Sequence, residues 1–230
     1  MGQKKLVRFE AINEFANVLQ YPEGMPGQWK EFFNNEHPIT LELACGKGEY
    51  SVGQGRMHPG RNFIGVDIKG NRIYIGAKIA LAEGLKNVAF LRAQIQQLTQ
   101  YFNAQEVQEI WIIFPDPFLR ESKAKNRLTH ARFLKEYQQI LASGGIIHLK
   151  TDSKELYDFT LESITEQGCT IHHQIEDIYS KELVHEALAL KTFYEQMHLA
   201  EGRKINYISF SLPNKPIFIP EKKKKNVATE

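Results

Sequence analysis

Residues 39–49 read Ile-Thr-Leu-Glu-Leu-Ala-Cys-Gly-Lys-Gly-Glu, an apolar run followed by a turn with two glycines. The run Ile39–Leu43 predicts a short buried strand, and the turn leads into a helix that begins near Glu49. Gly46 and Gly48 lack a Cβ atom, so the backbone of the turn can approach a ligand closely. A strand, a glycine turn and a helix in this order indicate a ligand site at the carboxyl end of a strand in an α/β sheet.

Outward from this segment, short apolar runs alternate with helical patterns. The further predicted strands are Asn62–Asp67, Asn87–Arg92, Ile110–Phe114 and Ile146–Lys150, and the predicted helices are Asn71–Glu83, Thr129–Leu141 and Lys154–Gln167. Such strands are typical of a parallel sheet covered by helices on both faces. Two late strands, Ile171–Ile175 and Ile205–Leu212, flank a helical piece around Leu183–Leu199 and predict an antiparallel edge. We therefore expect a mostly parallel, seven-stranded sheet with an antiparallel edge strand.

The chain divides into three parts. Residues 1–38 are expected to hold an N-terminal helix, Ala11–Gln20, and a connecting segment with a turn rich in proline and glycine. Residues 39–215 form the α/β domain. Residues 216–230, which include a run of four lysines, form a basic tail that we expect to be disordered, with RNA contact as the alternative.

The composition sets outer limits on function. The chain has 230 residues, 42% of them hydrophobic, which is enough for one sizeable core. Residues 1–8 are charged and lack the apolar segment of a secretory signal, so we expect none, and no apolar run of about 18 residues predicts a membrane span. The two cysteines, Cys45 and Cys169, lie far apart and favour reduced thiols and a cytoplasmic protein. The net charge of +2 does not by itself indicate nucleic acid.

The distribution of charge is more informative than its sum. From residue 120 to residue 135 the chain has a single acid, Glu121, and six basic residues: Arg120, Lys123, Lys125, Arg127, Arg132 and Lys135. This run follows a strand end and predicts a surface for a polyanion, with a solvated face as the alternative. We expect Arg120, Lys123, Lys125 and Arg127 to meet phosphates, which fix register rather than sequence.

The acids near the glycine turn discriminate between two cofactor classes. Asp67 ends the second strand, where a carboxylate can accept both hydroxyls of a ribose. A dinucleotide site favours a third glycine at position 51, where this chain has Ser51. Glu49 would repel a pyrophosphate at the helix N-terminus, although it also suits the helix dipole. With Glu42 nearby, these acids favour S-adenosylmethionine, which carries a sulfonium and an ammonium group, over NAD.

The fourth predicted strand ends in a rigid polar turn. Residues 111–118 read Trp-Ile-Ile-Phe-Pro-Asp-Pro-Phe, which places Asp116 at the carboxyl edge of the sheet. Ligands of open α/β sheets bind at this edge. The two flanking prolines stiffen the turn, so Asp116 is held at a low entropic cost. The alternative for Asp116 is a local hydrogen bond within the turn.

From about Ile39 to Leu212 the chain resembles the bacterial tRNA (guanine-N7)-methyltransferase family. The motifs that carry the resemblance are Glu-Leu-Ala-Cys-Gly-Lys-Gly-Glu at 42–49, Arg-Asn-Phe-Ile-Gly-Val-Asp at 61–67, Ile-Phe-Pro-Asp-Pro at 113–117, Gly-Gly at 144–145, His-Leu-Lys-Thr-Asp at 148–152 and Thr-Phe-Tyr-Glu at 192–195. The resemblance implies a Rossmann-like class I methyltransferase fold. It also implies S-adenosylmethionine as cofactor, with the target guanine in the tRNA variable loop, at position 46 of the tRNA.

The same resemblance assigns site residues. The implied cofactor contacts are Glu42, Gly46, Gly48, Asp67, Gln94 and Asp116, and Asp116 is also the implied catalytic residue. The implied substrate contacts are Arg120, Asp152, Thr192, Phe193, Tyr194 and Glu195. Three features depart from the family pattern: Gln94 replaces an acid, Phe118 replaces a tryptophan, and the basic run after Asp116 is thinned. We expect no metal, and the protein to be a monomer or homodimer.

The chemistry follows from guanine N7, which has a lone pair and no proton. Methylation there needs alignment with the methyl group rather than a general base. Asp116, Asp152 and Glu195 are candidates to accept hydrogen bonds from guanine N1–H and its amine. Thr192 either bonds the base or caps a helix. Phe118 or Tyr194 can stack on the base, with a position in the core as the alternative for Phe118.

Three other functions stay open at this point. One is a methyltransferase for a protein or a small molecule, and a small substrate would not need the basic run from Arg120 to Lys135. A NAD-dependent oxidoreductase is disfavoured by Ser51 and Glu49. A silent RNA-binding module would have no need of Glu42, Asp67 and Asp116.

Overall fold

An eight-stranded sheet runs through residues 3–219, the part of the chain that the computed structural model describes. Its strand order is β1-β4-β3-β2-β5-β6-β8-β7. The strands are β1 (Val18–Gln20), β2 (Ile39–Leu43), β3 (Asn62–Asp67), β4 (Val88–Arg92), β5 (Val107–Ile113), β6 (Leu141–Thr151), β7 (Thr170–Ile175) and β8 (Asn206–Ser211). All neighbouring pairs are parallel except those of β8, which is antiparallel to β6 and β7. The predicted α/β architecture is confirmed.

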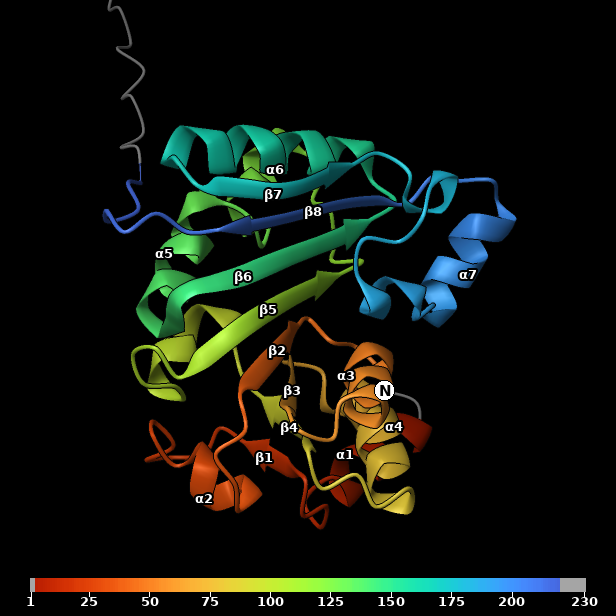
Figure 1. Ribbon diagram of the computed structural model, residues 1–230. Helices are drawn as coiled ribbons and strands as arrows, with labels where there is room; N and C mark the ends of the chain where they lie inside the picture. The colour runs from red at the N-terminus through yellow and green to blue at the C-terminus, as the bar shows by residue number, and fades with distance from the viewer. Residues whose placement is uncertain (1–2, 220–230) are drawn as a thin grey trace, which may run out of the picture.

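Helices cover both faces of this sheet (Figure 1). The α-helices are α1 (Gln3–Ala11), α2 (Trp29–Phe33), α3 (Glu49–Met57), α4 (Gly70–Ala82), α5 (Ala131–Ile140), α6 (Lys154–Gln167) and α7 (Phe193–Ala200). Short 3-10 helices are η1 (Ile95–Gln100), η2 (Glu121–Asn126), η3 (Ile178–Ser180) and η4 (Glu186–Ala189). Among the described residues, none of these helices combines the length and apolar character that a membrane span requires.

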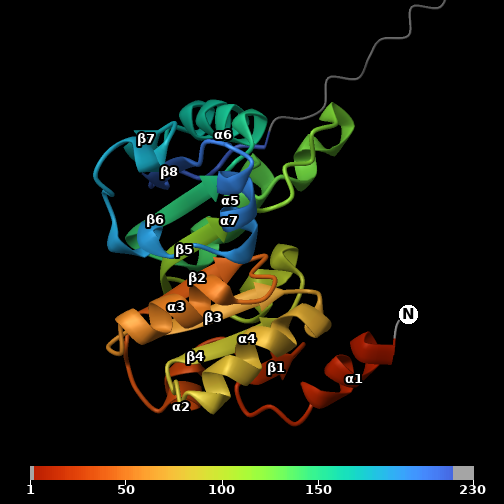
Figure 2. The same ribbon diagram turned by 90° about the vertical axis from the view of Figure 1, so that its right-hand side faces the viewer.

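The core divides into a part on each face of the sheet. Adjacent residues of β3, Phe63 and Ile64, belong to different cores because successive side chains of a strand point to opposite faces. The larger core contains Ile64 and residues of α2, α5 and α6, such as Trp29 and Tyr137. The other face carries α3 and α4, which lie side by side (Figure 2), and a third cluster around Trp111 supports the segment 178–190.

The predicted helix Ala11–Gln20 is wrong. α1 ends at Ala11, and Val18–Gln20 forms β1, which pairs with β4 and adds an eighth strand to the seven expected. The buried side-chain amide of Asn17 donates a hydrogen bond to the backbone carbonyl of Ala77 (3.1 Å). The backbone carbonyl of Asn17 accepts one from the backbone N–H of Phe90 (2.8 Å). The open edge of β4 needs backbone partners, and this distant requirement overrides the local helical spacing.

The C-terminal segment contacts the domain at Ile217 and Phe218. Ile217 is buried, and the backbone N–H of Phe218 donates to the side chain of Gln167 on α6 (2.8 Å). The first residues of the predicted tail are therefore docked on α6. Its lysine run, 222–225, lies outside the described residues.

Candidate active site

The carboxyl ends of β2, β3, β4 and β5 surround a cavity of about 610 Å³. This volume is within the range of small-molecule sites, about 300–1,000 Å³. Asp67, Gln94 and Asp116, three of the residues proposed from sequence, all line the cavity. Apolar side chains, among them Ile68 and Phe133, form much of the remaining wall. The structure thus brings together residues that are up to 49 positions apart in the chain, from 67 to 116.

Asp67 is fixed in the cavity wall by backbone donors. Its Oδ2 accepts from the N–H of Gly46 (2.9 Å) and its Oδ1 accepts from the N–H of Lys69 (2.8 Å). A carboxylate oxygen can accept more than one hydrogen bond, so each retains capacity for a ligand. The arrangement suits a vicinal diol such as that of a ribose.

The glycine turn depends on the absence of a side chain at Gly48. This residue has φ +66°, and a Cβ atom there would lie 2.2 Å from the ring of Phe90. Any larger residue would both strain the backbone and clash with a fully buried ring. Gly46 also has positive φ (+56°). Gly48 lines a second cavity of about 240 Å³ together with Glu49 and Thr192, so the turn separates two hollows of the surface.

Glu42 lies beneath the glycine turn and not among the residues that line the larger cavity. It is 4% exposed, and its carboxylate accepts hydrogen bonds from the backbone and hydroxyl of Ser51. Burial raises the pKa of Glu42 from 4.5 to about 8, and the negative charges of Glu49 and Asp67 add to this effect. From the sequence, Ser51 was informative only because it stands where a dinucleotide site favours glycine. In the structure its hydrogen bonds to Glu42 connect α3 to β2. The cofactor contact of Glu42 stays a prediction.

The raised pKa of Glu42 predicts a pH-dependent stability. The folded state retains this proton between pH 4.5 and about 8, whereas the unfolded state loses it, so the stability from this group is lost as pH rises through that window. Glu42→Gln keeps an acceptor for Ser51 without the ionisation. We expect its free energy of unfolding to rise relative to the parent by about 1 kcal/mol per pH unit in that window. Urea unfolding from pH 5 to pH 9 measures this difference.

A matched control for this experiment is Glu14→Gln, since Glu14 is exposed on the surface. Its free-energy difference from the parent should stay constant over the same pH range. A constant difference for Glu42→Gln as well would contradict the raised pKa.

Asp116 stands in a strained turn after β5. The backbone on either side, at Phe114 (φ +46°) and Phe118 (φ +44°), is left-handed, which non-glycine residues adopt at an energetic cost. Oδ1 of Asp116 accepts from the N–H of Phe118 (3.0 Å), so the local turn bond considered from sequence is formed. Within the described residues, Oδ2 accepts no hydrogen bond and is available to a ligand. The side chain is exposed and the Phe118 ring is half-buried.

Arg127 does not have the phosphate-contact role that we expected from the sequence. We expected this residue to meet phosphate, but it is only 6% exposed. Its Nε donates to the carbonyl of Pro117 (3.1 Å) and its Nη2 to the carbonyl of Phe118 (3.2 Å), while its guanidinium stacks over Phe159 (4.4 Å). Arg127 therefore clamps the turn that holds Asp116. The other three residues of the predicted phosphate contact, Arg120, Lys123 and Lys125, are exposed on and beside η2.

Asp152 follows the carboxyl end of β6 and lies close to two basic side chains that could not be identified from sequence. Its Oδ2 accepts from Nη1 of Arg203 (2.8 Å) and lies 3.6 Å from Nδ1 of His198. His198 comes from α7 and Arg203 from the loop that follows α7. Each stands far from Asp152 in sequence, so only the fold reveals the cluster.

The segment 192–195 begins α7. Oγ1 of Thr192 accepts from the N–H of Glu195 (3.2 Å), so Thr192 caps the helix, one of the two roles left open from sequence. Phe193 and Tyr194 are about half exposed, and Nζ of Lys47 lies 4.3 Å above the Phe193 ring. Glu195 is fully buried and pairs with Lys150. The substrate contacts of these residues stay predictions.

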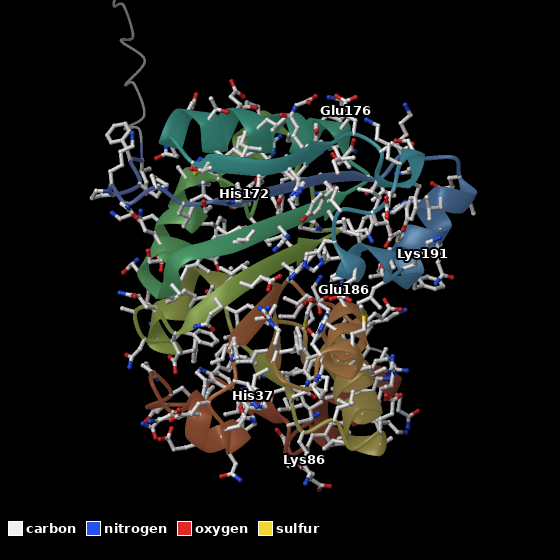
Figure 3. All side chains as sticks on the ribbon, in the orientation of Figure 1. His37, Lys86, His172, Glu176, Glu186 and Lys191 are labelled. Atoms are coloured by element: carbon white, nitrogen blue, oxygen red, sulfur yellow. The ribbon has the colours of Figure 1, made fainter. Side chains whose placement is uncertain are left out.

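Two histidines on β7 lie away from both cavities. His172 (Figure 3) and His173 accept or donate hydrogen bonds with Ser211 (3.1 Å) and Ser209 (2.9 Å) of β8. They contribute to the sheet edge.

Solved structures with the same fold are methyltransferases. The 16S rRNA methyltransferase KamB matches with a TM-score of 0.63 at 14% identity, over 86% of this chain and 99% of its own. The 16S rRNA (adenine(1408)-N(1))-methyltransferase of Catenulisporales acidiphilia, solved with its cosubstrate SAM, matches with a TM-score of 0.55 at 13% identity, over 84% and 94%. The chain therefore shares the fold of these methyltransferases.

The family follows from sequence relatives. The family model Methyltransf_4, described as "Putative methyltransferase", matches residues 36–208. The tRNA (guanine-N(7)-)-methyltransferase of Bacteroides fragilis is 46% identical over 93% of this chain and 87% of its own. That of Porphyromonas gingivalis is 49% identical over 87% and 86%. The chain belongs to this family of tRNA (guanine-N(7)-)-methyltransferases.

Proposed function

We propose that this protein transfers the methyl group of S-adenosylmethionine to N7 of a guanine in the variable loop of tRNA, at position 46. The observation that carries the proposal is the 46–49% identity to relatives named tRNA (guanine-N(7)-)-methyltransferase over most of both chains. The cavity at the sheet edge supports it, because Asp67, Gln94 and Asp116 meet there. In this proposal the enzyme works in the cytoplasm as a monomer or homodimer.

The residues of the cavity fit S-adenosylmethionine. The Asp67 carboxylate would accept hydrogen bonds from the two ribose hydroxyls, and the exposed side-chain amide of Gln94 would accept one from the adenine amine. Apolar side chains such as Ile95 and Phe133 flank the space for the adenine ring. The cofactor supplies an electrophilic methyl group on a cationic sulfonium. Glu49 is the acid that favours this cation over a pyrophosphate, whereas Glu42, whose pKa is raised to about 8, would meet the cofactor as a neutral carboxylic acid.

Asp67→Ala is expected to weaken binding of S-adenosylmethionine by about 1–3 kcal/mol, the scale for losing charge-assisted hydrogen bonds. The variant loses the acceptors for the ribose and also releases the Gly46 N–H that Asp67 fixes. Titration calorimetry of the parent and the variant measures the change. Asp158→Ala, which alters an exposed aspartate on α6, is the control and should bind like the parent. Equal affinity of Asp67→Ala and parent would remove Asp67 from the cofactor site.

Arg120, Lys123 and Lys125 are proposed to contact tRNA phosphates beside the cavity. Binding through phosphates releases counterions, so affinity falls steeply with salt. The double variant Arg120→Glu/Lys125→Glu is expected to bind all tRNAs more weakly. The slope of log affinity against log salt should flatten by about one unit for each phosphate that the variant no longer neutralises. Filter binding at several salt concentrations measures the slope.

The matched control is Lys30→Glu/Lys86→Glu, which reverses two exposed charges at the amino edge of the sheet. Both side chains are exposed, and Lys86 lies at the end of the molecule opposite α6 (Figure 3). This control should leave the salt slope close to that of the parent. If the slope of Arg120→Glu/Lys125→Glu also stays unchanged, the run is a solvated face.

One assay tests the whole proposal. The protein is incubated with labelled S-adenosylmethionine and an unmodified tRNA transcript, and the product nucleosides are separated. We expect the label in 7-methylguanosine from the variable loop. Label in another nucleoside, or label only when a different acceptor is supplied, would support a methyltransferase of another substrate. Binding of tRNA without any label would support a silent RNA-binding module.

A further inference from the structure

Lys150 and Glu195 form an ion pair that is closed to solvent. Lys150 lies near the carboxyl end of β6, and Glu195 lies in the first turn of α7. Both side chains have 0% exposure, and Nζ lies 2.7 Å and 2.8 Å from the two carboxylate oxygens. Burial in a low-dielectric interior makes such a pair strongly dependent on both partners.

Other hydrogen bonds complete the pair. The ammonium of Lys150 also donates to the carbonyls of Leu188 (3.1 Å) and Leu190 (3.0 Å). The carboxylate of Glu195 accepts from the hydroxyl of Tyr179 (2.6 Å). The three protons of the ammonium and both oxygens of the carboxylate are therefore engaged inside the protein.

Lys150 also touches the turn that carries Asp116. Its backbone carbonyl accepts from the N–H of Phe114 (2.9 Å), two residues before Asp116. Its side chain meanwhile holds the segment 188–195, whose exposed residues Phe193 and Tyr194 stand beside the glycine turn. Figure 1 shows α7 just beyond the ends of β5 and β6. One residue thus joins the two parts of the proposed site.

We propose that Glu195 acts on the substrate only through Lys150, as a positioning residue whose carboxylate does not contact the guanine. The pair holds Thr192, Phe193 and Tyr194 at the rim of the site. This inference rests on the proposed function, and it replaces the substrate contact that the sequence resemblance implies for Glu195.

The alternative role would require the pair to open. To reach a guanine, Glu195 would have to leave Lys150 and Tyr179, and the ammonium would then face only two carbonyls in a closed interior. Removing one partner of a buried pair is far more damaging than replacing both by neutral groups. This asymmetry makes the two roles distinguishable by experiment.

The test is a double-mutant cycle with Glu195→Gln, Lys150→Met and the double variant Lys150→Met/Glu195→Gln. Urea unfolding gives stability, and methylation of a tRNA transcript gives kcat and KM. Each single variant is expected to raise KM for tRNA about tenfold, and the double variant to be no worse than either, since coupled residues are not additive. The control Lys30→Met/Glu31→Gln alters an exposed pair at the other edge and should match the parent.

A direct contact predicts a different pattern. Glu195→Gln would then impair methylation by the same factor in the parent and in the Lys150→Met background, and this result overturns the proposal. If a single variant does not fold, the folded double variant decides: methylation with KM raised by about tenfold or less supports the positioning role, and lost methylation contradicts it. Failure of the proposed function is recognised separately, because the parent would then not methylate tRNA, while the stability cycle still reports the pair.

Discussion

A tRNA that carries 7-deazaguanosine at the target position is expected to receive no methyl group from this protein. The 7-deaza base has a C–H in place of N7, so the in-plane lone pair that attacks the methyl group is absent. The remaining hydrogen-bonding groups of the base are unchanged. No alignment by the site can replace the missing nucleophile. Labelled methyl transfer to a transcript assembled with this single substitution measures the loss.

The same modified tRNA should still bind. Its N1–H and exocyclic amine remain available to the carboxylates of the site, and its phosphates remain available to Arg120 and Lys125. We therefore expect it to inhibit methylation of normal tRNA competitively, with an inhibition constant close to the KM of that tRNA. Transfer of label to the 7-deaza tRNA would show that another atom is methylated.

The predictable part of the fold is the part with strong local signals. The strands Ile39–Leu43 and Asn62–Asp67 and the helix Lys154–Gln167 have the predicted bounds. The last of these is bounded by Ser153, whose hydroxyl caps the helix, and by Gly168, which adopts the left-handed conformation at its end. Serine before a helix and glycine after it are typical capping residues, so both ends of this helix can be recognised from the sequence.

The features that could not be predicted depend on distant partners. β1 forms because the edge of β4 lies beside it, and nothing within residues 18–20 identifies that neighbour. Arg127 resembles its basic neighbours in sequence, but its exposure is decided by Phe159 on α6. In each case the local pattern was compatible with two states, and tertiary contacts selected one.

The candidate site also has a part that could be predicted from the sequence and a part that could not. Asp67, Gln94 and Asp116 follow strand ends, and parallel strands bring their carboxyl ends to one edge, so their convergence could be predicted. The clusters around Asp152 and Glu195 join residues about 45–50 positions apart through side chains alone. A charge in the sequence does not reveal whether its partner is a ligand or the protein.

Asp116→Asn is expected to lower kcat by about 10²–10³, the scale for losing one preorganised electrostatic partner. Methylation at N7 places a positive charge on guanine, and in the proposed function the Asp116 carboxylate balances this charge. The substitution preserves the shape of the turn, because the amide oxygen of asparagine can still accept from the N–H of Phe118 as Oδ1 does. The affinity for S-adenosylmethionine should change much less than kcat. Single-turnover methylation and calorimetry separate the two quantities.

The pH dependence of the methylation rate is a second test of the role of Asp116. Since N7 carries no proton, Asp116 need not act as a general base. The rate should therefore lack an acidic limb from deprotonation of a base near neutral pH. Asp158→Asn, which alters an exposed aspartate on α6 outside the cavity, is the matched control and should keep the kcat of the parent. Full activity of Asp116→Asn would contradict the assignment and would move the balancing charge to another carboxylate, with Asp152 the first to test.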